Sequence, residues 1–330
     1  MFFLPSLFHP RESGWGRPEF LTWILNAMCV SKAWYDTVMC THELWGGILP
    51  SLSYAPHWQL ACERAGEAPR RLLYGDVATW ARNDAQVTRA VSIHAEGSCS
   101  SWRDFGELLQ GLRLPHAKVL RLRPSEHNKP DLLPEARRSL TTAPSLIDCE
   151  ISSPIAFDAE NLRRLVVSNF WVDQLRHALS KLKSLRHLEI HRTRSVGKID
   201  WTALISQTNC ASLETLIFWC SADQSAQLQP GVNPIPAPCL RKVDAGGAIL
   251  LQSPHVRSMH LENVAWQDLA AVLSASSAAS LTVRSLIDGE PQAEGVDDLI
   301  LPVNLPLLDA AIEVTLIVMK VCGNSCTLQV

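Results

Sequence analysis

The stretch Leu185-Arg-His-Leu188-Glu-Ile190 contains the pattern that decides the fold. Its apolar residues are separated by two residues and then by one, and Leu162-Arg-Arg-Leu165-Val-Val167 has the same spacing. An apolar residue at every second position predicts a β-strand with one buried face. Segments between such strands, for example residues 172–182, have apolar residues at helical spacing. We therefore predict an α/β fold with a parallel sheet.

The pattern recurs along the chain at a roughly regular interval. Successive instances begin 16 to 29 residues apart, and most intervals match the 20–29 residues of leucine-rich repeats. The position at which such repeats usually have Asn or Cys is filled by other residues, such as Thr193 and Ala248. The sequence thus predicts a degenerate leucine-rich-repeat solenoid, with an ordinary α/β domain as the alternative. The instances begin at Ala117, Leu146, Leu162, Leu185, Leu213, Leu240, Val256, Ala278 and Leu305.

The residues that alternate with the buried ones are expected on the open, concave face of the sheet, which solenoids use for binding. Most of them are polar and are typical of a solvated sheet. Ile217 and Trp219 differ, because an apolar pair beside charged residues resembles a binding anchor. The alternative is that segment 230–238 covers Trp219. The candidate substrate-binding residues are Arg164, His187, Glu189, His191, Ile217 and Trp219.

Composition limits the possible functions. The chain has 330 residues, of which 47 % are hydrophobic, and its net charge is −3, so nothing favours binding to nucleic acid. Ten scattered cysteines and the lack of a basic leader favour the cytoplasm or nucleus, without membrane insertion. Five acidic residues form an expected acidic loop near 288–298. No catalytic, cofactor or metal motif is complete, so we expect a protein that is not an enzyme; an α/β hydrolytic or metal enzyme is the remote alternative.

The region before the repeats is predicted to be helical over residues 20–45 and 56–64, followed by a strand over 69–74. An apolar stripe comprises Val30, Trp34, Val38, Leu44 and Trp45. The segment Val30-Ser-Lys-Ala-Trp34-Tyr-Asp, followed by Leu44-Trp45, resembles the second half of an F-box. The segment from Trp58 to Leu72 is similar to the one that follows the F-box in a large, basidiomycete-type group of fungal F-box proteins with degenerate leucine-rich repeats. The Leu-Pro helix that opens the family's pattern is expected to be missing or reduced here, because Met1–Phe8 is followed by a polar stretch.

The resemblance implies an architecture and a role. Residues 1–50 would be a degenerate F-box-like segment, 51–114 a connector, and 115–330 the repeat domain. The stripe would bind a Skp-family adaptor and, through it, a cullin–RING ligase, while the repeats bind a protein substrate. The chain would then be the non-catalytic substrate receptor of an SCF-type ubiquitin ligase. The alternative is a leucine-rich-repeat scaffold without adaptor binding.

Overall fold

The chain forms two compact units, residues 1–130 and 131–330. A computed structural model describes residues 18–49, 52, 55–74, 87–97, 113–124, 141–152, 157–168, 170, 172–191, 193, 199, 201–206, 210–219, 228, 233–265, 268, 271–272, 280–286, 313–319 and 325–329. Three predictions concern residues outside these ranges. They are the loss or reduction of the first F-box helix, the acidic loop near 288–298 and the repeat beginning at Leu305.

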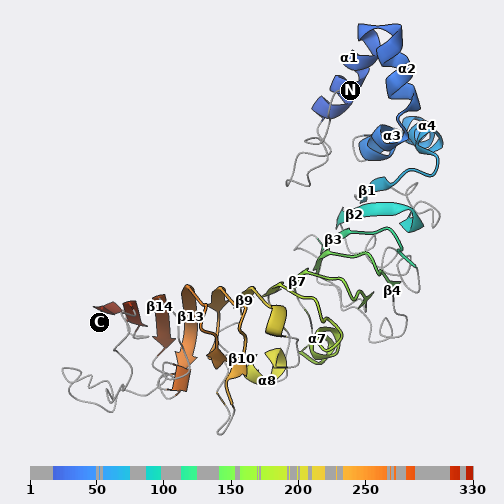
Figure 1. Cartoon of the computed structure of the whole chain (residues 1–330). Helices are drawn as coiled ribbons and strands as arrows, with labels where there is room; N and C mark the ends of the chain where they lie inside the picture. The colour runs from blue at the N-terminus through green and yellow to red at the C-terminus, as the bar shows by residue number, and fades with distance from the viewer. Residues whose placement is uncertain are drawn as a thin grey trace, which may run out of the picture. The chain divides into compact units, whose positions relative to one another are not determined.

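The first unit begins with four helices, α1 (Pro18–Val30), α2 (Lys32–Cys40), α3 (His42–Ile48) and α4 (Ala55–Ala65), as the periodicity predicts. The side chain of Ser31 caps α2 by accepting a hydrogen bond from the backbone N–H of Trp34, at 3.3 Å. Helix α1 packs against α2, and α3 packs against α4 (Figure 1). Gly66 ends α4 with a φ of 54°, the left-handed conformation that glycine adopts readily.

Three parallel strands follow in this unit: β1 (Arg70–Tyr74), β2 (Ala90–Gly97) and β3 (Val119–Pro124). Strand β1 also contacts α3, where the backbone of Gly46 lies directly against the carbonyl oxygen of Pro69. Arg70 is 2 % exposed, and its Nη2 donates hydrogen bonds to the carbonyl oxygens of Cys62 (3.1 Å) and Gly66 (2.6 Å). This side chain therefore fixes the end of α4 to the start of the sheet.

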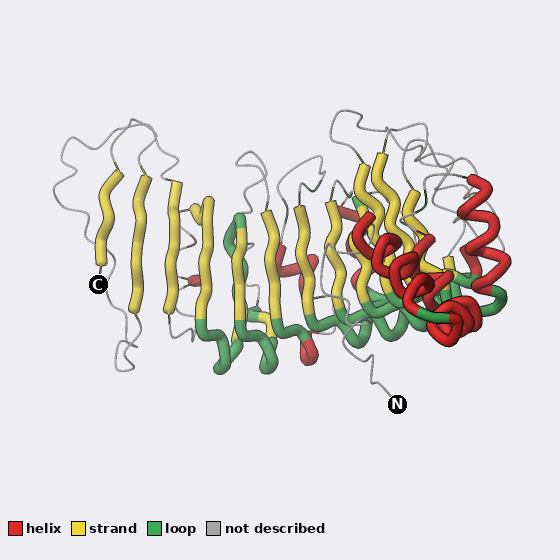
Figure 2. Tube along the Cα trace, turned by 90° about the horizontal axis from the view of Figure 1, so that it is seen from above, coloured by secondary structure: helices red, strands yellow, loops and turns green. Residues whose placement is uncertain are grey.

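The second unit contains a large sheet whose strands follow one another in chain order. Among the described residues the sheet has nine strands; each pairs in parallel with the next, except for the last, β16, which is antiparallel. The strands lie side by side in Figure 2. They are β5 (Asp148–Ile151), β7 (Arg164–Ser168), β8 (His187–His191), β9 (Thr215–Trp219), β11 (Lys242–Ala245), β13 (Ser258–Ala265), β14 (Ser280–Leu286), β15 (Glu313–Met319) and β16 (Ser325–Gln329).

One face of this sheet is the core. Strands β5, β8 and β9 alternate strictly between half-buried and buried residues, and the buried ones are those of the repeated pattern. Helices α7 (Val172–Leu179) and α8 (Trp201–Ile205) lie on this face (Figures 1 and 2). Trp201 of α8 stacks on Phe218 of β9 with ring centroids 4.3 Å apart, and both are fully buried. No described helix of this unit lies on the opposite face, which we call the open face (Figure 2).

Backbone hydrogen bonds between the residues that directly precede the strands connect each strand to the next. The backbone N–H of Arg186 donates to the carbonyl of Arg163 (2.8 Å), Glu214 donates to Arg186 (2.7 Å), and Arg241 donates to Glu214 (2.9 Å). Side chains add to this ladder: the hydroxyl of Ser212 donates to the carbonyl oxygen of Leu185 at 3.1 Å. The degenerate repeats are thus held mainly by backbone atoms.

The predicted α/β class with a parallel sheet is confirmed, and the described strands fall on the repeated pattern from Ala117 to Ala278. Four short strands, β4 (Thr141–Thr142), β6 (Phe157–Asp158), β10 (Ile235–Pro236) and β12 (Leu251–Gln252), form two small parallel ladders that the pattern did not predict. Strands β2, β15 and β16 were also missed. The buried hydroxyl of Thr193, at the position that usually holds Asn or Cys, makes no hydrogen bond to any described residue.

Candidate functional site

The six predicted substrate-binding residues lie together on the open face of three adjacent strands. Strand β7 contributes Arg164, β8 contributes His187, Glu189 and His191, and β9 contributes Ile217 and Trp219. Strand pairing places Arg164 opposite His187, Glu189 opposite Ile217, and His191 opposite Trp219. The sequence pattern alone predicted this arrangement, because parallel strands in matched register place equivalent residues side by side.

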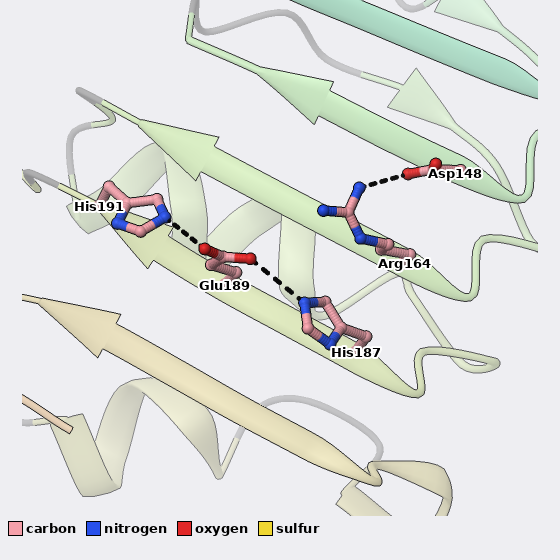
Figure 3. A network of polar contacts seen from close by, with 5 residues as sticks. All are labelled: Asp148, Arg164, His187, Glu189 and His191. Carbon is pink, nitrogen blue, oxygen red and sulfur yellow. Dashed lines mark hydrogen bonds and ion pairs between the residues drawn. The ribbon is translucent and has the colours of Figure 1, made fainter. Parts of the chain in front are cut away.

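The centre of the site is the carboxylate of Glu189, which lies between two imidazoles of its own strand (Figure 3). Its Oε1 is 2.7 Å from Nε2 of His191, and its Oε2 is 3.3 Å from Nε2 of His187. Residues two apart on a strand point to the same face, so the His-x-Glu-x-His spacing is sufficient to create this cluster. All three side chains are about one quarter to one third exposed.

The carboxyl of Glu189 is held in its charged form. Burial alone would raise its pKa. The hydrogen bonds from His187 and His191 and the nearby imidazole charges lower the pKa by more than burial raises it, so it lies below its ordinary value. Strand β8 therefore presents a carboxylate that stays ionised in a half-buried setting.

Next to this cluster, Arg164 is already engaged. Its Nη1 donates to Oδ1 of Asp148 on β5 at 2.8 Å, and the two side chains are 36 % and 20 % exposed (Figure 3). The positive charge of Arg164 is therefore compensated within the sheet. A ligand would meet this pair as a neutral neighbour of His187.

Apolar side chains border Glu189 in the adjoining strands. Val166 lies opposite Glu189 on β7 and Ile217 lies opposite it on β9. Trp219 is half-buried at the end of β9. The described part of segment 230–238 pairs through β10 with β12, in a ladder separate from β9. The open face thus combines one ionised carboxylate with an apolar border.

The candidate set omitted charged residues farther along the same face. Asp244 on β11 lies opposite Ile217, and His260 on β13 lies opposite Asp244. Nε2 of His260 is 3.2 Å from Oε1 of Glu262, which repeats the His-x-Glu contact of β8. The sequence signal that could have found this pair is the second occurrence of His-Leu-Glu, which lies two residues out of register with the first, because strand pairing aligns His260 with Glu189.

The predicted adaptor-binding stripe divides into a buried and an exposed part. Val38 is 2 % exposed and Trp45 is 8 % exposed; Nε1 of Trp45 donates to the carbonyl oxygen of Val38 at 3.0 Å, and the guanidinium of Arg64 lies over the Trp45 ring. These two side chains belong to the core of the helical segment. Leu44 is half-buried, whereas Val30 (68 %) and Trp34 (45 %) remain exposed.

Helices α1 and α2 expose further large apolar side chains that the stripe did not include. They are Trp23 (42 %), Leu25 (51 %) and Tyr35 (43 %). Exposed apolar residues scattered singly are ordinary on a protein surface, and helices α1 and α2 together expose five of them among their described side chains.

The chain matches no model of a protein family, and no curated protein matches it. Within the described ranges, no helix has the length and apolar character needed to cross a membrane. The same residues contain no group of three or more His, Cys, Asp or Glu placed to hold a metal ion. In the His187–Glu189–His191 cluster, both imidazoles direct Nε2 at the carboxylate.

Proposed function

We propose that this chain is a protein–protein interaction module, and specifically the substrate receptor of an SCF-type ubiquitin ligase. In this proposal α1 and α2 bind a Skp-family adaptor that links the chain to a cullin–RING ligase. The parallel sheet is the inner wall of a leucine-rich-repeat solenoid, and its open face binds the substrate. The chain itself performs no chemistry.

The observation that carries the proposal is the exposure of Val30 and Trp34, two apolar residues of the F-box-like motif that lie on the packed helices α1 and α2. A tryptophan costs free energy when water surrounds it, and aromatic residues are enriched at the centres of protein interfaces. Trp45, by contrast, makes the hydrogen bond that holds α2 to α3. The motif would therefore serve two purposes: its buried half would build the helical segment, and its exposed half would contact the adaptor.

The test is co-purification of the full chain with a purified Skp-family adaptor. We expect capture by the unmodified chain and loss of capture by Trp34→Ala, which removes an exposed ring without opening a core cavity. The matched control is Leu60→Ala, because Leu60 is also a large apolar residue, 42 % exposed, but lies on α4. If the folded chain fails to capture the adaptor, or if Trp34→Ala captures it as well as Leu60→Ala does, the adaptor role is wrong. A repeat scaffold without adaptor binding would then be the better description.

A further inference from the structure

The open face of the second unit carries an excess of negative charge. Strands β5 to β13 present five carboxylates and two basic side chains there, a net charge of −3 when the imidazoles are neutral. One of the two bases, Arg164, is paired with Asp148. The carboxylates are Asp148, Glu150, Glu189, Asp244 and Glu262, and the bases are Arg164 and Lys242.

Two of these carboxylates flank one apolar residue. Strand register places Glu189 on one side of Ile217 and Asp244 on the other. Adjacent strands are about 4.8 Å apart, so the backbone positions of the two acids are roughly 9.6 Å apart across the sheet. Oδ1 of Asp244 is buried and accepts no hydrogen bond from any described residue. A buried carboxylate oxygen without a donor is costly, and the Asp244 side chain as a whole is half-buried, so its carboxylate adds negative charge to the open face.

The apolar border of Glu189 suits the stems of long basic side chains. Lys and Arg lay their methylene groups on apolar surface while the charged head reaches a carboxylate. Ile217 is half-buried and offers such surface beside Glu189, whereas Val166 on the other side is buried; the half-buried ring of Trp219 adds an aromatic face of the kind that accepts a cation. Acidic ligands would instead meet a face that already has excess negative charge.

We propose that the open face of β8, β9 and β11 binds an extended protein segment carrying two or more Lys or Arg residues, with Glu189 and Asp244 as the anionic contacts and Ile217 and Trp219 as the apolar contacts. The inference rests on the proposed function, in which this face selects the substrate. It adds the chemical class of that substrate: a basic, extended segment.

The experiment measures binding of two fluorescein-labelled twelve-residue peptides to the full chain by fluorescence anisotropy at pH 7.5. One peptide has Lys or Arg at every third position among Ala and Leu, and the other has Glu at those positions. We expect the basic peptide to bind at least about tenfold more tightly, with an affinity that falls as salt increases. Equal binding, tighter binding of the acidic peptide, or no binding of either would overturn the proposal.

Single substitutions then locate the contact. Glu189→Gln keeps the shape of the side chain and should weaken binding of the basic peptide about tenfold, the loss of one charge-assisted contact. Trp219→Ala should also weaken it. The matched control is Glu214→Gln, since Glu214 is likewise paired with a basic residue, Arg186, at 3.2 Å, but precedes β9. If Glu189→Gln and Glu214→Gln bind the peptide equally well, the site does not lie on this face.

Adaptor capture is measured separately: a chain that captures the adaptor but does not prefer the basic peptide refutes only this inference. A chain that prefers the basic peptide but does not capture the adaptor refutes only the ligase role.

Discussion

Replacement of Phe218 by alanine probes the register of the whole second sheet. Phe218 is fully buried on β9 and stacks on Trp201 of α8 with an interplanar angle of 25°. Ile217, its neighbour on the same strand, points to the open face and is half-buried. The two residues therefore test the same strand from opposite sides.

The expected costs differ severalfold. Removing a fully buried phenylalanine ring loses its transfer free energy and its stacking partner and leaves a cavity, about 4 kcal/mol. Ile217→Ala removes a smaller side chain from a half-exposed position, about 1 kcal/mol. With a urea m-value of about 2 kcal/mol/M, these costs shift the unfolding midpoint by about 2 M and about 0.5 M.

Urea unfolding followed by circular dichroism measures both variants against the unmodified chain. Phe218→Leu is the intermediate case, because it keeps most of the apolar volume and should lie between the two. If Ile217→Ala destabilises the protein as much as Phe218→Ala, or more, then β9 is displaced by one residue. The open face, and with it the proposed binding site, would then be assigned to the wrong side of the sheet.

Each of the remaining predictions compares two residues, or the unmodified chain with one variant. Gly46→Ala should destabilise the protein by about 2 kcal/mol or more, because a methyl group there would collide with the backbone carbonyl oxygen that it packs against; Gly47→Ala, in open space on the same helix, should be neutral or stabilising by up to about 1 kcal/mol in thermal unfolding. The pKa of Glu189 is lower in the folded chain than in the unfolded chain, so its ionised carboxylate stabilises the fold above about pH 4.5. This stabilisation is lost as the pH falls through the folded-state pKa. The unfolding free energy of the unmodified chain should therefore fall more steeply from pH 5 to pH 3 than that of Glu189→Gln. Burial raises the pKa of the Cys62 thiol to about 11, so thiol labelling at pH 8 followed by peptide mapping should modify exposed Cys40 in the native chain and Cys62 only after unfolding.

Much of the second sheet could be predicted from the sequence because one local rule, the spacing of three apolar residues, determines both the strand and its buried face. Leu188 and Ile190 of the quoted stretch are fully buried, and Glu189 between them faces the other side. The candidate site followed directly, since parallel strands in register place His191 beside Trp219.

The features that were missed depend on contacts distant in the chain. The stripe of F-box-like residues has one helical period, yet Val38 and Trp45 are buried while Trp34 is exposed. Trp45 donates a hydrogen bond to the carbonyl oxygen of Val38, and Arg64 of α4 lies over the Trp45 ring. The short ladders β4–β6 and β10–β12 have two residues per strand, which is too short for alternation to be recognised. The buried oxygen of Asp244 is a property of its neighbours, and no local pattern encodes it.

The way in which the strands are joined explains why the open face can specialise. The strand-to-strand ladder through Arg163, Arg186 and Glu214 is made by backbone N–H and carbonyl groups, so it places few demands on side chains. The core side of each strand is fixed by apolar packing, as the Phe218–Trp201 stack illustrates. Side chains on the open face are not fixed by the core, although pairs such as Arg164–Asp148 link neighbouring strands. A cluster such as His187–Glu189–His191 therefore differs from strand to strand without change to the buried pattern, and this freedom is what the proposed binding role of the face requires.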